Sequence, residues 1–203
     1  LAVLEKTAAE AKDAAGAINA LYTLDGLNRL AAAVVEAALA HREPGVRRHA
    51  LRLAERRFGE NKTLLLTVIK MVEDKSAIVR LQLALTLGES TDPRATAALA
   101  QLATRHGADE WLNDAVLSSL GGRAGEMLAA LLEEPKESAR VRGLVRRLCT
   151  TVASRRNAKE FSSALVRVAR LENRDFQRLC LSGFRAPFKS TTTVALSKPA
   201  ADA

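Results

Sequence analysis

The chain is poor in the residue types on which most binding and catalytic sites depend. Aromatic side chains make up 3% of its 203 residues, and the only cysteines are Cys149 and Cys180. No C-x-x-C or C-x-x-C-H motif occurs, which excludes zinc-knuckle, thioredoxin-like and covalent haem sites in this segment. The cysteines lie close to one repeat apart in the chain. We expect two buried thiols on neighbouring helices rather than a disulfide, because packed helix axes about 8–10 Å apart rarely bring two Cα atoms within bonding range.

Long apolar runs are also missing. No stretch approaches the roughly 20 consecutive apolar residues that span a bilayer, so we expect no membrane insertion by this segment. The chain begins at Leu1, without an initiator Met and without a basic and then apolar leader. We therefore expect Leu1 to be a cut end, which leaves the compartment of the parent protein open.

The motifs of common catalytic and cofactor sites are absent as well. His41, His49 and His106 are scattered, and no carboxylate cluster joins them at metal-ligand spacing. The serines have no G-x-S-x-G context, and no glycine-rich phosphate loop occurs. The glycine-rich segment 121–125 is expected to be a tight turn between two helices. We therefore expect no catalytic, cofactor-binding or metal-binding residue, no cofactor and no enzymatic activity in this segment.

What the chain does contain is a repeated helical pattern. Hydrophobic residues make up 48% of it, and Ala and Leu, which have high helix propensity, dominate. The segment 74–88 starts with an acid, continues with Val79-Arg80, and runs through small and aliphatic residues to a glycine. Related segments begin at Val46, one period upstream of Val79, and at Leu112, one period downstream. Such even spacing, with helical signatures in each copy, indicates stacked helical hairpins.

The pattern predicts an all-α fold, a right-handed α-solenoid of stacked antiparallel helix pairs with about 12 helices. Each pair exposes an apolar stripe that only its neighbours in the stack can cover. We align Val141-Arg142 with the earlier Val-Arg pairs, after a slightly shorter step from Leu112. A single solenoid is expected over 1–184, and an extended or disordered tail over 185–203. The predicted units are about 1–42, 43–73, 74–106, 107–134, 137–171 and, in part, 172–184.

The repeat resembles one known family of helical repeats. Over residues 43–121 the copies approximate a pattern of an acid, three to five residues, Val-Arg, two residues, a small residue or Leu, one residue, and Leu-Gly. The T-P-L-H of ankyrin repeats is absent, and so is the Trp, Leu-Gly and Tyr pattern of tetratricopeptide repeats. The pattern is similar to the shorter, bacterial form of the HEAT-like repeat, which implies an armadillo-like scaffold for protein–protein interaction.

Longer segments carry a closer resemblance. They are NALYTLDGL at 19–27, PGVRRHALRLAE at 44–55, and ASRRN and QRLCLSG within 148–183. These resemble the HEAT segment of large planctomycete and verrucomicrobial proteins of the membrane-bound dehydrogenase type. Those proteins join a β-propeller, a HEAT solenoid and a C-terminal, haem-binding cytochrome c-like domain. This chain has Tyr22 where that family has Trp, and it contains neither the propeller nor the haem motif.

The resemblance implies a periplasmic or cell-envelope location and places any redox chemistry in other parts of the parent. The first functional hypothesis is therefore a non-catalytic spacer and protein-interaction module of a larger redox protein. Its partners would be other domains of the parent chain or an acidic protein. The second hypothesis is a nucleic-acid-binding HEAT module of the DNA glycosylase type. A third, a lyase that handles a tetrapyrrole, rests on the repeat type alone.

The charge distribution keeps the second hypothesis open. The net charge is +8, but residues 136–189 hold 14 basic and 4 acidic residues, a net charge of +10. Stacking of three successive helices would merge these residues into one positive surface for phosphates or an acidic protein face. The alternative is a solvated face whose arginine stems cover the hydrophobic layer. The candidates for contact with an anionic partner are Arg140, Arg142, Arg146, Arg147, Arg155, Arg156, Arg170, Arg174 and Arg178, with Lys159 and Arg167 beside them.

Acid–arginine pairs recur with the repeat. Arg47 follows Glu43 by four residues, and Arg80 follows Asp74 by six. In HEAT-like repeats such groups commonly form a ladder between repeats, and we expect this structural role here. Arginines that face a ligand are the alternative. At position 113 the repeat has Asn instead of Arg, which interrupts a continuous charged track.

Overall fold

The structure of the protein, a computed structural model, describes residues 1–59, 61–107, 109–133 and 139–188, without the side chains of residues 62, 139 and 140. Throughout this part the regular structure is helical, with no strand. The helices pack as pairs, so the predicted all-α solenoid of helix pairs is confirmed. None of the described helices combines the length and the apolar character needed to cross a membrane.

Twelve α-helices and two short 3₁₀ helices lie in the described part of the chain. Their bounds are α1 (Ala2–Glu10), α2 (Ala14–Gly26), α3 (Ala32–Leu39), α4 (Pro44–Ala54), η1 (Glu55–Arg57), α5 (Lys62–Lys70), η2 (Met71–Glu73), α6 (Ala77–Gly88), α7 (Pro93–His106), α8 (Glu110–Ser118), α9 (Ala124–Glu133), α10 (Ala139–Ser154), α11 (Ala158–Ala169) and α12 (Arg174–Arg185).

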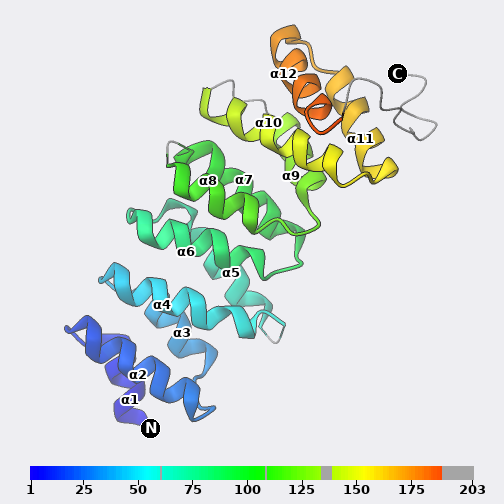
Figure 1. Cartoon of the computed structure of the whole chain (residues 1–203). Coiled ribbons are helices and arrows are strands. Elements are labelled where there is room, and N and C mark those ends of the chain that lie inside the picture. Colours follow the sequence, from blue (N-terminus) through cyan, green and yellow to red (C-terminus); the bar gives the residue numbers. More distant parts are fainter. Residues whose placement is uncertain (60, 108, 134–138, 189–203) are drawn as a thin grey trace. The chain divides into compact units, whose positions relative to one another are not determined.

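The chain divides into two compact units, Leu1–Ala98 and Leu99–Ala203, which we call unit 1 and unit 2. The boundary falls inside α7. In unit 1, α2, α4 and α6 form one layer and α1, α3 and α5 form the other, with α1 against α2 and α3 against α4 (Figure 1). In unit 2, α10 packs on α12 in one layer and α9 packs on α11 in the other.

Capping side chains and prolines explain where many helices begin. Asp13 accepts hydrogen bonds from the N–H groups of Ala15 and Gly16 at the start of α2. Such a cap satisfies amide groups that the first turn of a helix leaves unpaired. Pro44 and Pro93 open α4 and α7, where a missing N–H and a fixed φ are tolerated. Side-chain caps of the same kind are Asn61 at α5, Asp109 at α8, Asn157 at α11 and Asn173 at α12.

The repeat period is also a period of burial. Val46, Val79, Leu112 and Val145 follow one another at a constant spacing in the sequence, and each is at most 1% exposed. They occupy α4, α6, α8 and α10, so the same position of these four helices faces a core. The alignment of Val141 with this series was therefore one turn out of register. The reason is that α10 begins one turn earlier in the repeat than α8 does, and it buries both valines.

The segment after α12 begins by packing on unit 2. The ring centroid of Phe188 lies 6.1 Å from that of Phe161 on α11. The Phe188 N–H also donates a hydrogen bond to the carbonyl oxygen of Arg185 at 3.0 Å. The first residues of the predicted tail are thus held against the helices, and the rest of it, 189–203, lies outside the described residues.

Candidate functional site

A bidentate ion pair links consecutive hairpins of unit 1. Arg47 on α4 donates from Nε and Nη2 to the two carboxylate oxygens of Asp74, at 2.7 and 2.9 Å. Its Nη1 also donates to the carbonyl oxygens of His41 and Arg42, at 2.8 and 2.9 Å. The Arg47 side chain is 16% exposed and that of Asp74 is 9% exposed. The pair is therefore poorly screened by salt, and it uses the planar fork of arginine, which lysine lacks.

Both partners of this pair are held in their charged forms. Burial by itself would raise the pKa of Asp74, but hydrogen bonds from Arg47 and from the Ser76 N–H outweigh it and hold that pKa below its usual value. The hydrogen bond to Asp74 raises the pKa of Arg47 in turn. This charge state favours a structural role for the pair, because a group that moves protons needs a pKa near neutrality.

A hydrogen bond from the side chain to a backbone carbonyl oxygen recurs at the same position of the repeat. Nη1 of Arg80 donates to the carbonyl oxygen of Asp74 at 2.7 Å, and Nδ2 of Asn113 donates to that of Gly107 at 3.0 Å. Each side chain reaches back six residues, as Arg47 does. Asn113 therefore keeps the backbone contact of the series although it lacks the charge.

Glu43, the acid nearest to Arg47 in sequence, does not provide its carboxylate partner. The Glu43 carboxylate lies 3.6 Å from Nε of Arg42. Arg47 instead binds Asp74, which belongs to the next predicted unit and lies 27 residues further along the chain. The ion pair thus joins two repeats, whereas a Glu43–Arg47 pair would have stayed within one.

A second partly buried ion pair in unit 1 was not foreseen from the sequence. Arg57 donates from Nη2 to Asp25 at 2.8 Å and from Nη1 to the Leu53 carbonyl oxygen at 2.7 Å. Its side chain is 16% exposed and that of Asp25 is 18% exposed. The separation of Arg57 and Asp25, 32 residues, is close to one repeat and was the signal that could have revealed the pair.

Links between residues one repeat apart occur in both units. In unit 1 the Thr86 hydroxyl donates to Glu55 at 2.8 Å across 31 residues. In unit 2 the Thr150 hydroxyl donates to the Gly183 carbonyl oxygen at 3.0 Å across 33 residues. Each unit is therefore held together from one helix pair to the next by side chains as well as by its core.

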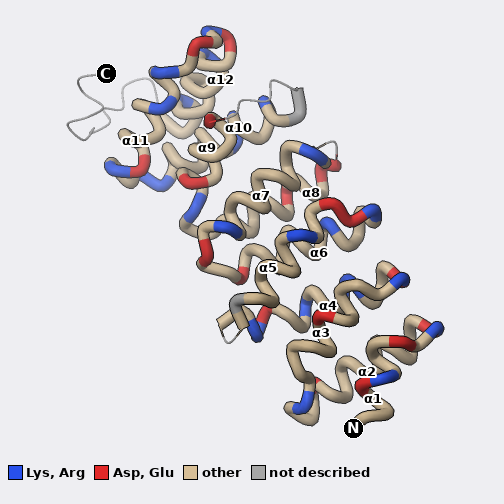
Figure 2. Tube along the Cα trace, turned by 180° about the vertical axis from the view of Figure 1, so that it is seen from behind, with Lys and Arg blue, Asp and Glu red and all other residues tan. Residues whose placement is uncertain are grey.

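The arginines proposed for an anionic partner in unit 2 are paired in several places. Arg147 on α10 lies 2.7 Å from a carboxylate oxygen of Asp114, and Arg178 on α12 lies 3.1 Å from one of Asp175. Figure 2 shows acidic positions beside basic ones along α11 and α12. This pairing lowers the potential of the surface below that suggested by the sequence count.

Other members of the set make contacts of different kinds. The Arg142 guanidinium lies 5.7 Å from the centroid of the Phe176 ring, and Arg174 donates to the side chain of Gln177 at 2.9 Å. Arg155 lies 3.4 Å from a carboxylate oxygen of α11. The side chain of Arg140 is outside the described residues. The remaining three members of the set are Arg146, Arg156 and Arg170, and none of them forms an ion pair within the described part of the chain.

The histidines make structural contacts. His41, which is buried, lies with Nε2 3.0 Å from the Ala11 carbonyl oxygen and accepts the Glu43 N–H at Nδ1. These two partners fit a neutral ring with its proton on Nε2. Nδ1 of His49 lies 3.0 Å from the Tyr22 hydroxyl, and burial followed by nearby arginines lowers the pKa of His49. No cluster of three His, Cys, Asp or Glu side chains suited to a metal ion occurs among the described residues.

Cys149 and Cys180 are buried free thiols on the neighbouring helices α10 and α12, as the sequence predicts. A hydrogen bond to Cys180 and burial together raise the pKa of Cys149. The Cys149 thiol therefore stays protonated and is a poor nucleophile. The pair therefore contributes packing between α10 and α12.

Unit 2 has two open grooves, one beside α10 and α12 and the other between α9 and α11. One, of about 530 Å³, is lined by Arg146, Leu181, Ser182, Arg185, Ala186 and Phe188. The other, of about 400 Å³, lies between α9 and α11 and includes Glu126, Glu160 and Arg167. Of these two grooves, only the first combines two arginines with apolar side chains.

Comparison with known proteins supports the repeat type. Residues 31–121 match the family described as HEAT repeats. The matched segment extends from the residue before α3 to the turn after α8 and includes the Arg47–Asp74 pair. This part of the chain is therefore similar to HEAT repeats, a class that commonly mediates protein interactions. No curated protein and no solved structure matches the chain.

Proposed function

We propose that this chain is a non-catalytic scaffold, which serves as a spacer and protein-interaction module. The single observation that carries the proposal is the partly buried Arg47–Asp74 pair, because it commits the charged groups of the repeat to joining one hairpin to the next. The mechanism is geometric. Stacked pairs of helices present a continuous surface and hold whatever is attached to it at a fixed distance.

The chain is further proposed to act within a larger redox protein of the dehydrogenase–cytochrome c type in the cell envelope. This step is supported by the segments 19–27, 44–55 and 148–183 and their resemblance to such proteins. Electron transfer would then belong to other domains of the parent. Sequencing of the flanking gene tests the proposal. We expect a propeller-type region upstream and a C-x-x-C-H motif downstream, and an open reading frame without either would contradict it.

Nucleic-acid binding is the second candidate function, and the net charge of +10 over residues 136–189 favours it. The ion pairs of Arg147 and Arg178 count against it, because each pair removes a charge from a phosphate-binding surface. Three of the four aromatic side chains of residues 136–189, Phe161, Phe176 and Phe184, are buried and cannot stack on bases.

Titration of a fluorescein-labelled 20-base-pair duplex with the whole chain decides between the two functions. Under the scaffold proposal, binding at about 150 mM salt stays at or above the micromolar range, as for other basic proteins, and weakens steeply with added salt. A sub-micromolar complex that prefers one DNA sequence or lesion would instead establish the nucleic-acid function.

A further inference from the structure

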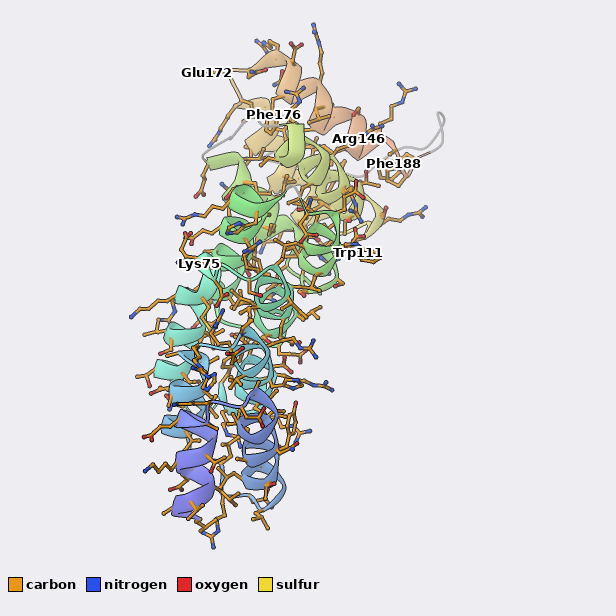
Figure 3. The ribbon with its side chains drawn as sticks, turned by 90° about the vertical axis from the view of Figure 1, so that its left-hand side faces the viewer. Lys75, Trp111, Arg146, Glu172, Phe176 and Phe188 are labelled. Carbon is orange, nitrogen blue, oxygen red and sulfur yellow. The ribbon has the colours of Figure 1, made fainter. Side chains whose placement is uncertain are left out.

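The groove at the end of α12 brings together side chains that the sequence does not connect. Arg146 comes from the middle of α10, whereas Leu181, Ser182 and Arg185 come from the last turns of α12. Phe188, three residues beyond α12, completes the lining. Figure 3 shows Arg146 and Phe188 beside each other on one face of unit 2.

The two arginines of this groove have no acidic partner among the described residues. Among the described residues no carboxylate forms an ion pair with Arg146 or Arg185, although Arg147 and Arg178 on the same two helices are paired. Both guanidinium groups are exposed and line one groove. They form a concentrated positive site on a surface that is otherwise partly neutralised.

The carbonyl groups at the end of α12 do not cancel this charge. The Gly183 oxygen accepts hydrogen bonds from the Thr150 hydroxyl at 3.0 Å and from the Ala186 N–H at 3.2 Å. The Arg185 oxygen accepts the Phe188 N–H at 3.0 Å. These internal donors reduce the negative potential of the helix end, so the groove favours an anion.

Apolar side chains form the rest of the groove. Leu181 is 46% exposed and so presents an apolar side chain to the groove. The Phe188 ring is half-buried, with one edge toward Phe161. A ligand that reaches both arginines can therefore place an apolar side chain against Leu181 and Phe188.

We propose that this groove binds a short acidic segment of a partner protein, with a carboxylate on Arg146 and Arg185 and an adjacent leucine or phenylalanine on Leu181 and Phe188. The proposal rests on the scaffold function and names the chemistry of its partner. Paired arginines fit carboxylates closely, and the apolar contact adds a selectivity that a sugar-phosphate backbone would not use. The chain's own residues 189–203 are a weaker match, because they contain two lysines and one aspartate.

Fluorescence anisotropy with the labelled hexapeptide Asp-Glu-Leu-Phe-Asp-Glu tests the assignment on the whole chain. The double variant Arg146→Gln/Arg185→Gln is expected to bind the probe at least tenfold more weakly than the unchanged chain. The matched control Arg147→Gln/Arg178→Gln removes the same charge from the same helices and is expected to change binding less than twofold. Leu181→Ser is expected to weaken binding at least threefold. Circular dichroism melts of all variants check that the helices remain folded.

Several results would overturn the assignment. Equal weakening by the two double variants would show general charge attraction, and unchanged binding by Leu181→Ser would show that the apolar wall is not used. Displacement of the probe by an equal concentration of duplex DNA would identify a nucleic-acid site. Tenfold tighter binding to a chain that ends at Phe188 would identify the chain's own tail as the occupant. Absence of saturable probe binding up to about 1 mM would show that the groove is not a binding site for acidic segments. The scaffold function would be tested separately, by the DNA titration and the gene sequence.

Discussion

Unit 1 and unit 2 are built from the same helical repeat, but they use their arginines differently. In unit 1, Arg47 and Arg57 are each 16% exposed and pair with acids one repeat away. In unit 2, Arg147 and Arg178 are 56% and 79% exposed in their ion pairs. Arg47 and Arg57 are therefore parts of the framework of unit 1, whereas Arg147 and Arg178 lie on the surface of unit 2.

Unit 2 joins α10 to α12 mainly by close packing. A Cβ atom on Gly183 would lie 2.7 Å from the Arg146 carbonyl oxygen and 2.8 Å from Cβ of Cys149, so only glycine allows the helices to come this near. Phe161 on α11 meets Phe184 edge to face, with ring centroids 5.2 Å apart. Packing of this kind needs no charged group between the helices.

The difference shows that one repeat period can be stabilised by two kinds of chemistry. A partly buried ion pair is stable only when its geometry replaces the water that both charges lose, so Arg47 cannot turn to a ligand without leaving Asp74 unpaired. An exposed arginine contributes little to stability and is free to bind. This contrast agrees with the proposed partner site in the groove of Arg146 and Arg185 on unit 2.

The largest expected effect is on the packing of unit 2. Phe176 on α12 is fully buried, beneath the guanidinium of Arg142. Phe176→Ala should lower the free energy of unfolding by about 3–5 kcal/mol, because it leaves a cavity between α10 and α12. Urea denaturation measures the loss, and hydrogen exchange should locate it in α10–α12. A loss below about 1 kcal/mol would mean that unit 2 does not depend on this packing.

The next effect concerns the ion pair of unit 1. Arg47→Ala should cost about 2–4 kcal/mol, because Asp74 and two carbonyl groups lose their donor. The control Arg52→Ala changes an exposed arginine of the same helix and should alter the free energy of unfolding by about 0.5 kcal/mol or less. Urea denaturation of both variants measures the difference. Equal losses for Arg47→Ala and Arg52→Ala would show that the buried ion pair stabilises unit 1 no more than an exposed arginine does. The distinction between the two units would then fail.

Acid should weaken unit 1 through Asp74. The folded-state pKa of this group is depressed, so its contribution to stability is present above its unfolded pKa, about 3.9, and is lost as the pH falls through the folded value. The hydrogen-exchange protection factors of α4 and α6 should therefore fall below about pH 4. The variant Asp74→Asn should be less stable than the unchanged chain at pH 7, and the gap should narrow in acid.

Glu55 provides an internal check on that result, because its contribution to stability changes with pH in the opposite direction. Burial raises its pKa in the folded state despite the hydrogen bond from Thr86. Its contribution is therefore present at acid pH and is lost as the pH rises through the folded pKa. Glu55→Gln should reduce this loss in urea titrations between pH 4 and pH 7. An acid profile unchanged by either variant would show that neither carboxylate controls the stability of unit 1.

The smallest expected effect belongs to the surface pairs of unit 2. Arg147→Ala should change the free energy of unfolding by less than about 1 kcal/mol, since its pair with Asp114 is exposed and screened by salt. Urea denaturation at low and high salt should show the small difference vanishing as salt is added. A salt-independent loss of about 2 kcal/mol would place this arginine in the framework, like Arg47.

Much of the fold was predictable because it depends on local sequence. Proline at 93 and the basic residues before Gly107 mark α7, which the structure bounds at Pro93–His106 as expected. The valines at 46 and 79 recur with the repeat and are buried. Asparagines at 61, 157 and 173 cap helices through contacts two or three residues away. Such contacts can be read from a short stretch of chain.

The partners of individual charges were harder to predict. The acid nearest to Arg47 in the sequence, Glu43, is not its carboxylate partner; that partner, Asp74, lies 27 residues away along the chain. The arginines of residues 136–189 looked equivalent in the sequence, yet Arg147 is paired and Arg146 lies in a groove. Adjacent residues of a helix point about 100° apart, so their surroundings depend on which helix lies beside each face.

The sequence by itself determined the helical hairpins, their period and the face of each helix that is buried, because propensity, capping and apolar spacing act within one or two turns. Only the tertiary structure decided which acid each arginine binds, which thiols meet and where two unpaired arginines share a groove. These depend on the lateral offset between helices that lie one repeat apart in the chain. An offset of a single residue turns a side chain from the interface toward water.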